Sequence, residues 1–565
     1  MSTYTLRPES EHGIPRKEIV KQFFYFLKTM READILEKPK SLGALREELA
    51  IRRRWGSLES GCLAINAKNH PDDLGFVDEE GELTYQEFFD RVYRLAHGLQ
   101  DFGVEEGSNV AVMALNGRAA VFPLCARQML GYHIFMVNAN SSGQQIHKVL
   151  EYHDIKTFIV DQEFYERLLP ETKEQFNIIL GFVDDPDEVG DLPTMNGIIE
   201  QTVLNAGEDR LPENPPKSQH VVMTSGTTGM PKGVVRRQLI SPQGIAPALA
   251  TVPWRRRMRV FIQGTLFHFY GWGIMMVVLV TGSAVITRRK HSSEQSLEII
   301  DKYDVDGWCS SASRLRAMIA ELDKRGVERG PKLDWITCSG SPLTAFEVES
   351  MNKYFGPILV NSYGSTETSA IAMGSGKMLA NDTRLTGRIF PGSRVEIRDE
   401  EGNLLPEGEI GEVYAGCYDM FVGYTDPDIK PAVKNGLIRM GDKGYRKGDR
   451  LYVIGRADDL IITQFSEKIF PSELEDVLIR DKRVAEVHVD AVRDEKYGQA
   501  IRCYVIREDG VTPDELNEDT VRTLLAEQLS DAHVPRDVFF MKDFPRNAMG
   551  KVIRPQLPNY STDDR

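Results

Sequence analysis

The sequence predicts an α/β protein in which a parallel or mixed sheet is covered by helices, and it predicts at least two domains. From residue 76 onward, short apolar segments typical of strands alternate with amphipathic segments typical of helices. This alternation favours a parallel sheet with helices on both faces. The chain has 565 residues, which exceeds the roughly 100 to 200 residues of one domain. A hydrophobic content of 41% and a charged content of 27% are typical of a soluble globular protein.

Residues 1–60 form an N-terminal extension that is predicted to contain an amphipathic helix. Its apolar stripe, which basic residues surround, consists of Ile19, Val20, Phe23, Phe24 and Leu27. Such a helix either packs against its own domain, which we favour, or makes a peripheral contact with an anionic membrane surface.

The first strand and helix units follow from caps and apolar periodicity. Thr84 and Glu87 form a capping box, and the helix behind them keeps apolar residues on one face until Gly103. Residues 110–115 are predicted to form a buried strand, residues 119–131 a helix and residues 156–160 the next strand. Near the C-terminus, a helix after Pro471, strands around 487–491 and 501–505, and a helix through 521–529 predict a separate small unit.

The segment 260–287 contains no Lys, Arg, Asp or Glu and is long enough to cross a bilayer. Glycine and polar residues interrupt it, however. We therefore predict that it forms a strand, a turn, a short buried helix and another strand within the core.

Charge and cysteine usage narrow the class of protein. The formal charge of −15 argues against a general nucleic-acid binder. The six cysteines are scattered without a CxxC pair, so neither a zinc site nor a disulfide framework is predicted. The first apolar cluster lies among lysines and lacks a small-residue cleavage site, so no signal peptide is predicted. These features favour the cytoplasm.

Residues 223–236 are predicted to form a phosphate-binding loop behind a short strand. Glycines let backbone N–H groups approach an anion, hydroxyl groups add donors, and Lys232 adds a cation. The glycines and hydroxyl residues are Gly226, Gly229 and Gly233, and Thr224, Ser225, Thr227 and Thr228. The loop differs from a Walker A motif, because Met230 and Pro231 precede the lysine and Gly233 follows it. A flexible surface turn is the alternative.

Two later segments place small and polar residues at predicted strand ends. The first contains the turn Ser339, Gly340 and Ser341. The second runs from Asn361 to Thr368 and offers the ring of Tyr363, small donors and the single carboxylate of Glu367. These groups suit a nucleoside base, a phosphate and Mg²⁺, respectively.

Six motifs, taken together and in order, resemble the acyl-adenylate-forming superfamily of acyl-CoA synthetases, peptide-synthetase adenylation domains and luciferases. They are the loop 224–233, the turn 339–341, the segment 363–367, Gly441-Asp442, the segment 455–459 and the segment 545–551. The resemblance covers about residues 60–557, and the extension with Trp55-Gly56 is similar to bacterial fatty-acyl-CoA ligases. It implies a large domain at 61–457, a small mobile α+β domain at 458–565 and a hinge at Asp458.

The resemblance implies that a carboxylate attacks the α-phosphate of ATP and that the thiol of CoA then attacks the acyl-adenylate. The implied phosphate-binding residues are Thr224, Ser225, Gly226, Thr227, Thr228, Gly229 and Lys232. Mg²⁺ would be bound by Thr224 and Glu367, and the α-phosphate would be contacted by Thr366. The implied nucleoside-binding residues are Ser339, Gly340, Ser341, Tyr363, Gly364, Asp442 and Arg456. Lys551 would bridge the carboxylate and the phosphate in the first step.

The second step leaves several alternatives open. His268 either positions the acyl group beside the thiol tunnel or is a satisfied core histidine. The arginines at 236–237 and 255–257 either meet CoA phosphates or lie in solvated loops. The segment Thr463 to Lys468 lacks the glycine that the family usually places near pantetheine, and Met440 replaces the usual threonine. The expected substrate is a fatty or other hydrophobic acid, with CoA as acceptor. An amine acceptor and a catalytically silent nucleotide-binding relative are the alternatives. Homodimerisation is frequent in the family.

Overall fold

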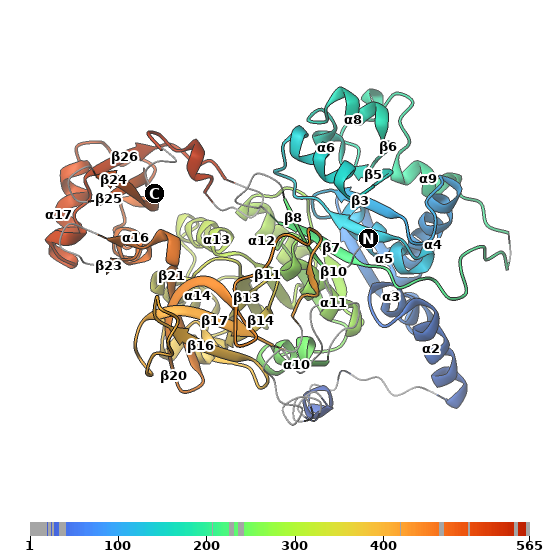
Figure 1. Cartoon of the computed structure of the whole chain (residues 1–565), viewed down its shortest axis with the longest axis horizontal. Coiled ribbons are helices and arrows are strands. Elements are labelled where there is room, and N and C mark those ends of the chain that lie inside the picture. The colour runs from blue at the N-terminus through green and yellow to red at the C-terminus, as the bar shows by residue number, and fades with distance from the viewer. Residues whose placement is uncertain are drawn as a thin grey trace.

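The computed structural model describes the chain from the N-terminal extension to Tyr560. The described residues are 20, 24, 27–32, 35, 41–205, 207–224, 231–235, 242–417, 420–462, 468–494, 498–546 and 552–560. A large domain of two sheets with covering helices occupies most of Figure 1, and a small C-terminal domain lies at its left.

The smaller sheet of the large domain has seven strands, five of them parallel, in the order β18-β8-β7-β4-β3-β5-β6. In chain order they are β3 (Asn109–Met113), β4 (His133–Met136), β5 (Thr157–Val160), β6 (Asn177–Leu180), β7 (His220–Thr224), β8 (Lys232–Val235) and β18 (Gly423–Tyr424). β7 and β8 pair antiparallel, with Thr224 opposite Lys232. The two ends of the predicted phosphate loop are thereby fixed against each other.

The larger sheet has 14 strands in the order β16-β17-β20-β21-β15-β14-β13-β12-β11-β9-β10-β1-β2, with β19 beside β20. Its strands are β1 (Leu74–Asp78), β2 (Gly81–Thr84), β9 (Arg259–Ile262), β10 (Ala284–Ile286), β11 (Gly307–Ser310), β12 (Trp335–Ser339), β13 (Leu359–Ser365), β14 (Ser369–Gly374), β15 (Gly387–Ile389), β16 (Arg394–Arg398), β17 (Gly411–Gly416), β19 (Val433–Lys434), β20 (Leu437–Lys447) and β21 (Arg450–Arg456). The run from β13 through β1 is parallel, and the remaining pairs are antiparallel. The mixed sheet agrees with the predicted fold class.

Helices cover both faces of the parallel run, because successive strand residues point to opposite sides. Val260 and Ile262 pack into one core with α3, α4, α5 and α11, whereas Phe261 packs into another with α12, α13 and α14. The helices of this domain are α3 (Glu59–Asn69), α4 (Tyr85–Asp101), α5 (Arg118–Leu130), α6 (Gly143–Tyr152), α7 (Gln162–Tyr165), α8 (Pro170–Gln175), α9 (Met195–Gln201), α10 (Pro242–Thr251), α11 (Phe269–Val280), α12 (Ser293–Lys302), α13 (Ala312–Lys324), α14 (Ala345–Phe355) and α15 (Gly376–Asn381). The predicted capping box of Thr84 and Glu87 starts α4.

The uncharged segment is part of this core, as predicted. It contributes β9, α11 and β10, and α11 has 12 residues. No helix in the described part of the chain is long and apolar enough to cross a membrane.

The N-terminal extension is packed only in part. Residues 27–32 are helical, and Met30 and Ile35 are buried. Val20, Phe24 and Leu27 are exposed, so these three members of the predicted stripe do not pack into the core as we favoured. Helix α2 (Leu42–Trp55) follows, and its Trp55 is buried.

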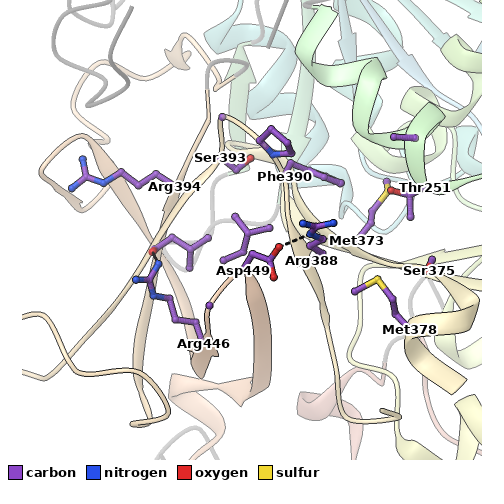
Figure 2. A pocket seen from close by; sticks show the side chains of 16 residues that line it. Thr251, Met373, Ser375, Met378, Arg388, Phe390, Ser393, Arg394, Arg446 and Asp449 are labelled. Carbon is purple, nitrogen blue, oxygen red and sulfur yellow. Dashed lines mark hydrogen bonds and ion pairs between the residues drawn. The ribbon is translucent and has the colours of Figure 1, made fainter. Parts of the chain in front are cut away.

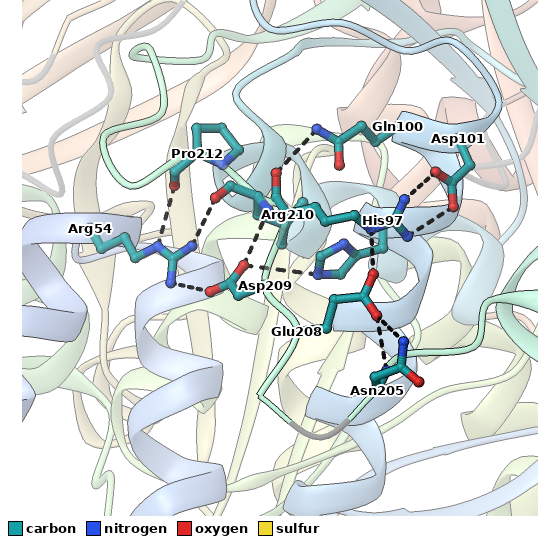
Figure 3. A network of polar contacts seen from close by, with 10 residues as sticks. Arg54, His97, Gln100, Asp101, Asn205, Glu208, Asp209, Arg210 and Pro212 are labelled. Carbon is teal, nitrogen blue, oxygen red and sulfur yellow. Dashed lines mark hydrogen bonds and ion pairs between the residues drawn. The ribbon is translucent and has the colours of Figure 1, made fainter.

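Segment 207–212, which leads toward β7, is held by a polar network with α2 and α4 (Figure 3). Arg54 donates to Asp209 over 2.6 Å and to the carbonyl oxygen of Leu211 over 3.1 Å. Arg210 pairs with Asp101 on α4. The extension is thereby joined to the segment that positions the phosphate loop.

The small domain has its own hydrophobic core and a three-stranded sheet in the order β24-β25-β26. Its strands and helices are β22 (Ile461–Ile462), β23 (Lys468–Ile469), α16 (Pro471–Leu478), β24 (Val484–Asp494), β25 (Gly498–Arg507), α17 (Glu518–Gln528) and β26 (Asp537–Met541). The predicted helices and strands of this region all occur. The combination of a large sheet domain and a small C-terminal domain therefore agrees with the prediction.

Candidate active site

The carboxyl ends of the parallel strands in the two sheets meet, and Thr224 and Glu367 of the predicted site residues lie at strand ends on this edge. Arg289, just after β10, forms an ion pair with Asp161, just after β5. Asn116, beyond β3, donates to the carbonyl oxygen of Gly264 over 3.0 Å and accepts from the backbone N–H of Leu266 over 2.9 Å. These contacts tie together the edges at which ligands bind in open α/β sheets.

The phosphate side of the site is built on the β7–β8 hairpin. The Thr224 hydroxyl donates to the Lys232 carbonyl oxygen over 3.2 Å. Thr425 follows β18, and its backbone N–H donates to the carbonyl oxygen of Gly233 over 2.8 Å. The loop residues Ser225, Gly226, Thr227, Thr228 and Gly229 lie outside the described residues.

Tyr424 connects the phosphate hairpin to the predicted magnesium ligand. Its hydroxyl donates to Glu367 Oε1 over 2.9 Å, and the Lys232 ammonium lies 5.7 Å from the centre of its ring. Burial, together with the charge of Glu367, raises the pKa of Tyr424. The tyrosine therefore stays protonated and keeps donating to the carboxylate. The sequence analysis did not identify this residue, because no local pattern links Gly423-Tyr424 to the hairpin.

The nucleoside side is organised by Asp442, which is opposite Arg456 in the β20–β21 pair. Its carboxylate accepts from the Tyr363 hydroxyl over 2.7 Å and from Arg456 Nη1 over 3.2 Å. Burial raises the pKa of Asp442, and the two donors oppose that rise. The three predicted residues Tyr363, Asp442 and Arg456 thus form one hydrogen-bonded group. Arg456 also donates to the Met440 carbonyl oxygen over 3.0 Å.

Two glycines allow this group to form. A Cβ at Gly364 would lie 1.9 Å from the carbonyl oxygen of Ser369, so the β13–β14 bulge admits no side chain there. Gly441 has φ +74° and would place a Cβ 2.7 Å from Arg456 Nη2. The backbone itself therefore brings the Tyr363 ring and the Asp442 carboxylate together.

The predicted turn 339–341 lies next to this group. Ser339 ends β12, and its hydroxyl donates over 2.8 Å to the carbonyl oxygen of Ser362 on β13. Gly340 is exposed, whereas Ser341 and Thr366 are half-buried. The turn thus adjoins β13, and Thr366 directly follows that strand.

His268, which is predicted to position the acyl group, directly precedes α11. It is the N-cap residue, and its ring lies 4.3 Å from the Phe267 ring, measured between centroids. Burial lowers the pKa of His268 to about 4, so its imidazole is neutral at pH 7.

Helix α11 is anchored to the N-terminal extension one turn after His268. Trp272 Nε1 donates to Glu59 Oε1 over 2.7 Å, and Arg127 forms a buried ion pair of 3.0 Å with the same carboxylate. Sequence reasoning assigned no role to Glu59, Arg127 or Trp272, because they are far apart in the chain. This network fixes where α11 begins, and hence where His268 lies.

The small domain contacts the large one through α16, and the predicted hinge leads into it. Asp476 accepts from the Phe346 backbone N–H over 3.0 Å, and Arg480 pairs with Glu349 over 2.8 Å. Asp458 is exposed in a short 3₁₀ turn, Ala457–Asp459. Lys551 and the glycine-free segment 463–467 lie outside the described residues.

The arginines considered for CoA phosphates lie at the opposite edge of the larger sheet. Arg255 pairs over 2.9 Å with Asp306, which precedes β11, and Arg257 pairs over 3.4 Å with Asp73, which precedes β1. Both arginines are thus neutralised at the amino ends of the strands. These ion pairs favour the alternative in which Arg255 and Arg257 lie in charged loops, and their interpretation as CoA ligands stays a prediction. Arg236 and Arg237 lie outside the described residues.

A separate groove of about 760 Å³ lies between α10 and strands β14, β15, β16 and β20 (Figure 2). Met373, Arg388, Arg394 and Arg446 line it, and Asp449 pairs with Arg388. None of its lining residues is a predicted site residue. This groove is therefore distinct from the predicted site residues that the structure describes.

Oxygen donors suited to Mg²⁺ occur at the site. Glu367 supplies a carboxylate and Thr224 a hydroxyl. Within the described ranges, no cluster of three or more His, Cys, Asp or Glu residues could hold a metal on its own. This donor set fits an ion that is bound by one or two protein groups together with substrate phosphates.

The two sheets with their shared carboxyl edge, a phosphate hairpin and a carboxylate beside an aromatic ring define a nucleotide-binding α/β enzyme. Residues 63–425 match the profile of AMP-binding enzymes, and residues 473–551 match the profile of the C-terminal domain of these enzymes. The first match alone covers more than half of the 565 residues. The chain therefore belongs to the AMP-binding enzyme family, which confirms the resemblance to acyl-adenylate-forming enzymes.

Individual relatives span nearly the whole chain. A 2-succinylbenzoate–CoA ligase of Bacillus licheniformis is 26% identical over 500 residues, which cover 88% of this chain and 98% of the relative. A fatty acid–[acyl-carrier-protein] ligase of Streptomyces coeruleorubidus is 25% identical and covers 87% of this chain and 94% of the relative. The o-succinylbenzoate CoA synthetase of Bacillus subtilis, solved with its acyl-adenylate intermediate, is similar in fold. Its TM-score is 0.72 at 23% identity, and the match covers 88% of this chain and 98% of that chain.

Proposed function

We propose that this protein is an ATP- and Mg²⁺-dependent ligase that converts a hydrophobic carboxylic acid to an acyl-adenylate and transfers the acyl group to the thiol of CoA. The observation that carries the proposal is the linked set Lys232, Tyr424 and Glu367 at the strand ends that also hold the Tyr363–Asp442–Arg456 group. Family membership and relatives named as CoA ligases support the same reaction.

The first half-reaction needs positioning and charge neutralisation rather than a general base. A carboxylic acid with a pKa of about 4 is already ionised at pH 7. Its oxygen attacks the α-phosphate, and pyrophosphate leaves. Lys232 and the loop 224–229 would hold the leaving phosphates, while Asp442 would accept from the ribose hydroxyls. Mg²⁺, bound by Glu367 and Thr224, would neutralise phosphate charge. Lys551 would stabilise the negative charge that develops as the oxygen attacks.

The second half-reaction uses the same site after the small domain has moved. We propose that this domain comprises residues 458–565, that the large domain comprises 61–457, and that rotation at Asp458 withdraws Lys551. The CoA sulfur then attacks the acyl carbonyl, AMP leaves, and the thiol proton is lost to solvent. His268 is neutral at pH 7 and would act by positioning the acyl group.

The sequence led us to expect a hydrophobic acid and favoured a fatty acid among them, but the relatives do not single out fatty acids. One relative is named for 2-succinylbenzoate, an aromatic acid, and another for fatty acids. We propose a hydrophobic acid in which an aryl group is as acceptable as an alkyl chain. We also propose that the enzyme is cytoplasmic, where six free, buried cysteines would stay reduced.

The proposal is tested by measuring AMP and pyrophosphate release with ATP, Mg²⁺ and a panel of short, medium and long fatty acids and aryl acids, each with and without CoA. Turnover that requires CoA and peaks at one acid is the expected result. Pyrophosphate exchange that CoA does not accelerate would redirect the search to amine acceptors, the alternative that the glycine-free segment 463–468 motivates. Absence of pyrophosphate release with every acid would contradict the enzymatic proposal.

Lys551→Ala tests the assigned step. Formation of acyl-AMP should fall by about two orders of magnitude or more, while ATP binding changes little, because the lysine acts on the transition state. Near-normal adenylation by this variant would remove Lys551 from the mechanism.

A further inference from the structure

Arg314 is a cation without a carboxylate partner at the carboxyl edge of the larger sheet. It lies in the first turn of α13 and is half-buried. Its Nη1 donates to His291 Nε2 over 3.0 Å, and within the described part of the chain it forms no ion pair. Burial lowers its pKa, since no nearby carboxylate offsets the lost hydration. Arginines in such surroundings are ordinarily paired with an anion.

His291 offers a second donor at the same place. Gln263 accepts from the Trp308 indole N–H over 2.9 Å through Oε1, which fixes the orientation of its amide. Its Nε2 therefore donates to His291 Nε2 over 2.7 Å, as Arg314 also does. The His291 proton is consequently on Nδ1, a buried atom that has no hydrogen-bond partner among the residues described. Burial, with Arg314 and Arg288 nearby, lowers the pKa of His291 to about 3.

Arg288 adds a second cation. It follows β10, is half-buried, and donates to the carbonyl oxygen of Thr287 over 2.9 Å. Arg288 helps to lower the pKa of Glu79 against the effect of burial, but the two form no ion pair among the described residues. Two guanidinium groups thus flank a neutral imidazole, and such a set of donors suits an oxyanion.

The location of these three residues points to the acid substrate rather than to the nucleotide. Gln263 directly follows β9 and Ser310 ends β11, and the Ser310 hydroxyl donates to Gln263 Oε1 over 2.9 Å. The nucleoside group comes from β13, β20 and β21, which lie beyond β12 on the other side of β11. The chain also runs directly from Gln263 to Phe267 and His268, which are predicted to lie beside the acyl group.

We propose that Arg314, with Arg288 and the Nδ1–H of His291, binds a second carboxylate on the acid substrate, so that the preferred substrates are dicarboxylic acids. This inference rests on the proposed function and refines its substrate class. One carboxylate is activated beside Lys232 and Glu367, while the other remains bound to Arg314 and does not react. The name of one group of relatives, 2-succinylbenzoate–CoA ligase, denotes an acid that carries a second carboxylate on its ring.

The test compares acids that differ only in the second carboxylate. Suitable pairs are 2-succinylbenzoate with 4-oxo-4-phenylbutanoate, and suberate with octanoate. We expect wild type to prefer one of the dicarboxylates, in kcat/KM for pyrophosphate release, by at least about tenfold over its partner. Arg314→Gln should lower kcat/KM for that dicarboxylate by about 10- to 100-fold and change the matched monocarboxylate by less than about twofold. Arg314→Lys, which keeps the charge but loses the planar fork, should recover part of the loss.

Arg255→Gln is the matched control, because it removes an arginine from the amino edge of the same sheet, where Asp306 already neutralises it. Arg288→Gln provides a second variant that should disturb folding less. It should shift the preference between dicarboxylate and monocarboxylate in the same direction as Arg314→Gln. Circular dichroism and melting temperature verify folding for each variant.

Three outcomes would overturn the inference. The first is an equal loss of kcat/KM for both acids of a pair in Arg314→Gln, which indicates a structural role. The second is a change in that variant that is confined to the KM for CoA, which indicates a phosphate ligand. The third is a preference of the wild type for monocarboxylates. In each of these cases pyrophosphate release still supports the ligase proposal. Only the absence of pyrophosphate release with every acid removes the proposed function, and the inference falls with it.

Discussion

The arginines at the two edges of the larger sheet differ in whether they form ion pairs with carboxylates. At the amino edge, Arg255, Arg257 and Arg259 each meet an aspartate, at 2.9, 3.4 and 3.8 Å. At the carboxyl edge, Arg288 and Arg314 form no ion pair with any described residue. An arginine that pairs with a carboxylate of its own chain contributes to the folded structure. A half-buried arginine without such a partner is suited to bind an anionic ligand.

Arg289 shows that this difference depends on the partner and not on the position in the chain. It is adjacent to Arg288, yet it pairs with Asp161 and Glu163 and joins the two sheets. Asp161 is fully buried and also accepts from the backbone N–H groups of Leu115 and Phe182. Arg289 therefore belongs with the structural arginines, although it lies at the catalytic edge.

The largest effect is expected for Arg289→Gln, which should lower the free energy of unfolding at pH 8 by about 3 kcal/mol, because it leaves a buried carboxylate without its cation. Burial already raises the pKa of Asp161 to about 6, against the influence of Arg289, and the variant should raise that pKa further. A carboxyl whose folded-state pKa exceeds its unfolded value favours the folded state at low pH and loses that contribution as pH rises.

The loss should therefore be larger at pH 8 than at pH 5, where Asp161 is mostly protonated. Denaturant unfolding at both values measures it, with Arg288→Gln as the neighbouring control. Equal destabilisation by the two variants would refute the distinction between Arg288 and Arg289.

Glu367→Gln should have the next largest effect, on activity and not on stability. Its carboxylate is half-buried and accepts from Tyr424, and the substitution keeps its shape while removing its charge. We expect acyl-AMP formation to fall about 100-fold, the cost of removing one preorganised electrostatic group, with an unchanged melting temperature. Pyrophosphate exchange at saturating ATP gives the rate. A melting temperature lowered as much as in Arg289→Gln would place Glu367 among the structural carboxylates instead.

Tyr424→Phe tests whether the new site residue acts through Glu367. Losing one hydrogen bond to a carboxylate should lower kcat for adenylation by about tenfold, with little change in the KM for ATP. In the Glu367→Gln background the same substitution should add almost nothing, because the carboxylate it positions is gone. Tyr445→Phe, which removes a hydroxyl from a tyrosine stacked on Tyr452, serves as the control. Additive losses in the double variant would show that Tyr424 acts independently of Glu367.

The sequence was sufficient for features that are local in the chain. The capping box at Thr84, the alternating strands and helices and the division of segment 260–287 all depend on residues close to one another. The order of the larger sheet was not predictable, because β15 pairs with β21 across a long stretch of intervening chain. No local pattern encodes such a pairing.

The same distinction applies to the site. The ends of the phosphate hairpin and the turn 339–341 could be predicted from their composition. That Tyr363 and Asp442 belong to one site could be predicted only from the family resemblance. Tyr424, Trp272 and Arg314 carried no signal, since each acquires its role from a partner brought in by the fold. The arginines at 255–257 left two alternatives open, because a basic run does not reveal the aspartates opposite Arg255 and Arg257.

The smallest effect is expected for Arg255→Gln, and it tests the amino edge directly. Its side chain is 60% exposed, so solvent screens its pairs with Asp306 and Asp334 and the free energy of unfolding should fall by less than about 1 kcal/mol. Both kcat and the KM for CoA should stay within about twofold of wild type, because Arg255 lies at the edge opposite the site. Steady-state kinetics across a CoA titration, together with denaturant unfolding, measure the two quantities. A KM for CoA that rises tenfold would mean that CoA reaches the amino edge, and the functional contrast between the two edges would be lost.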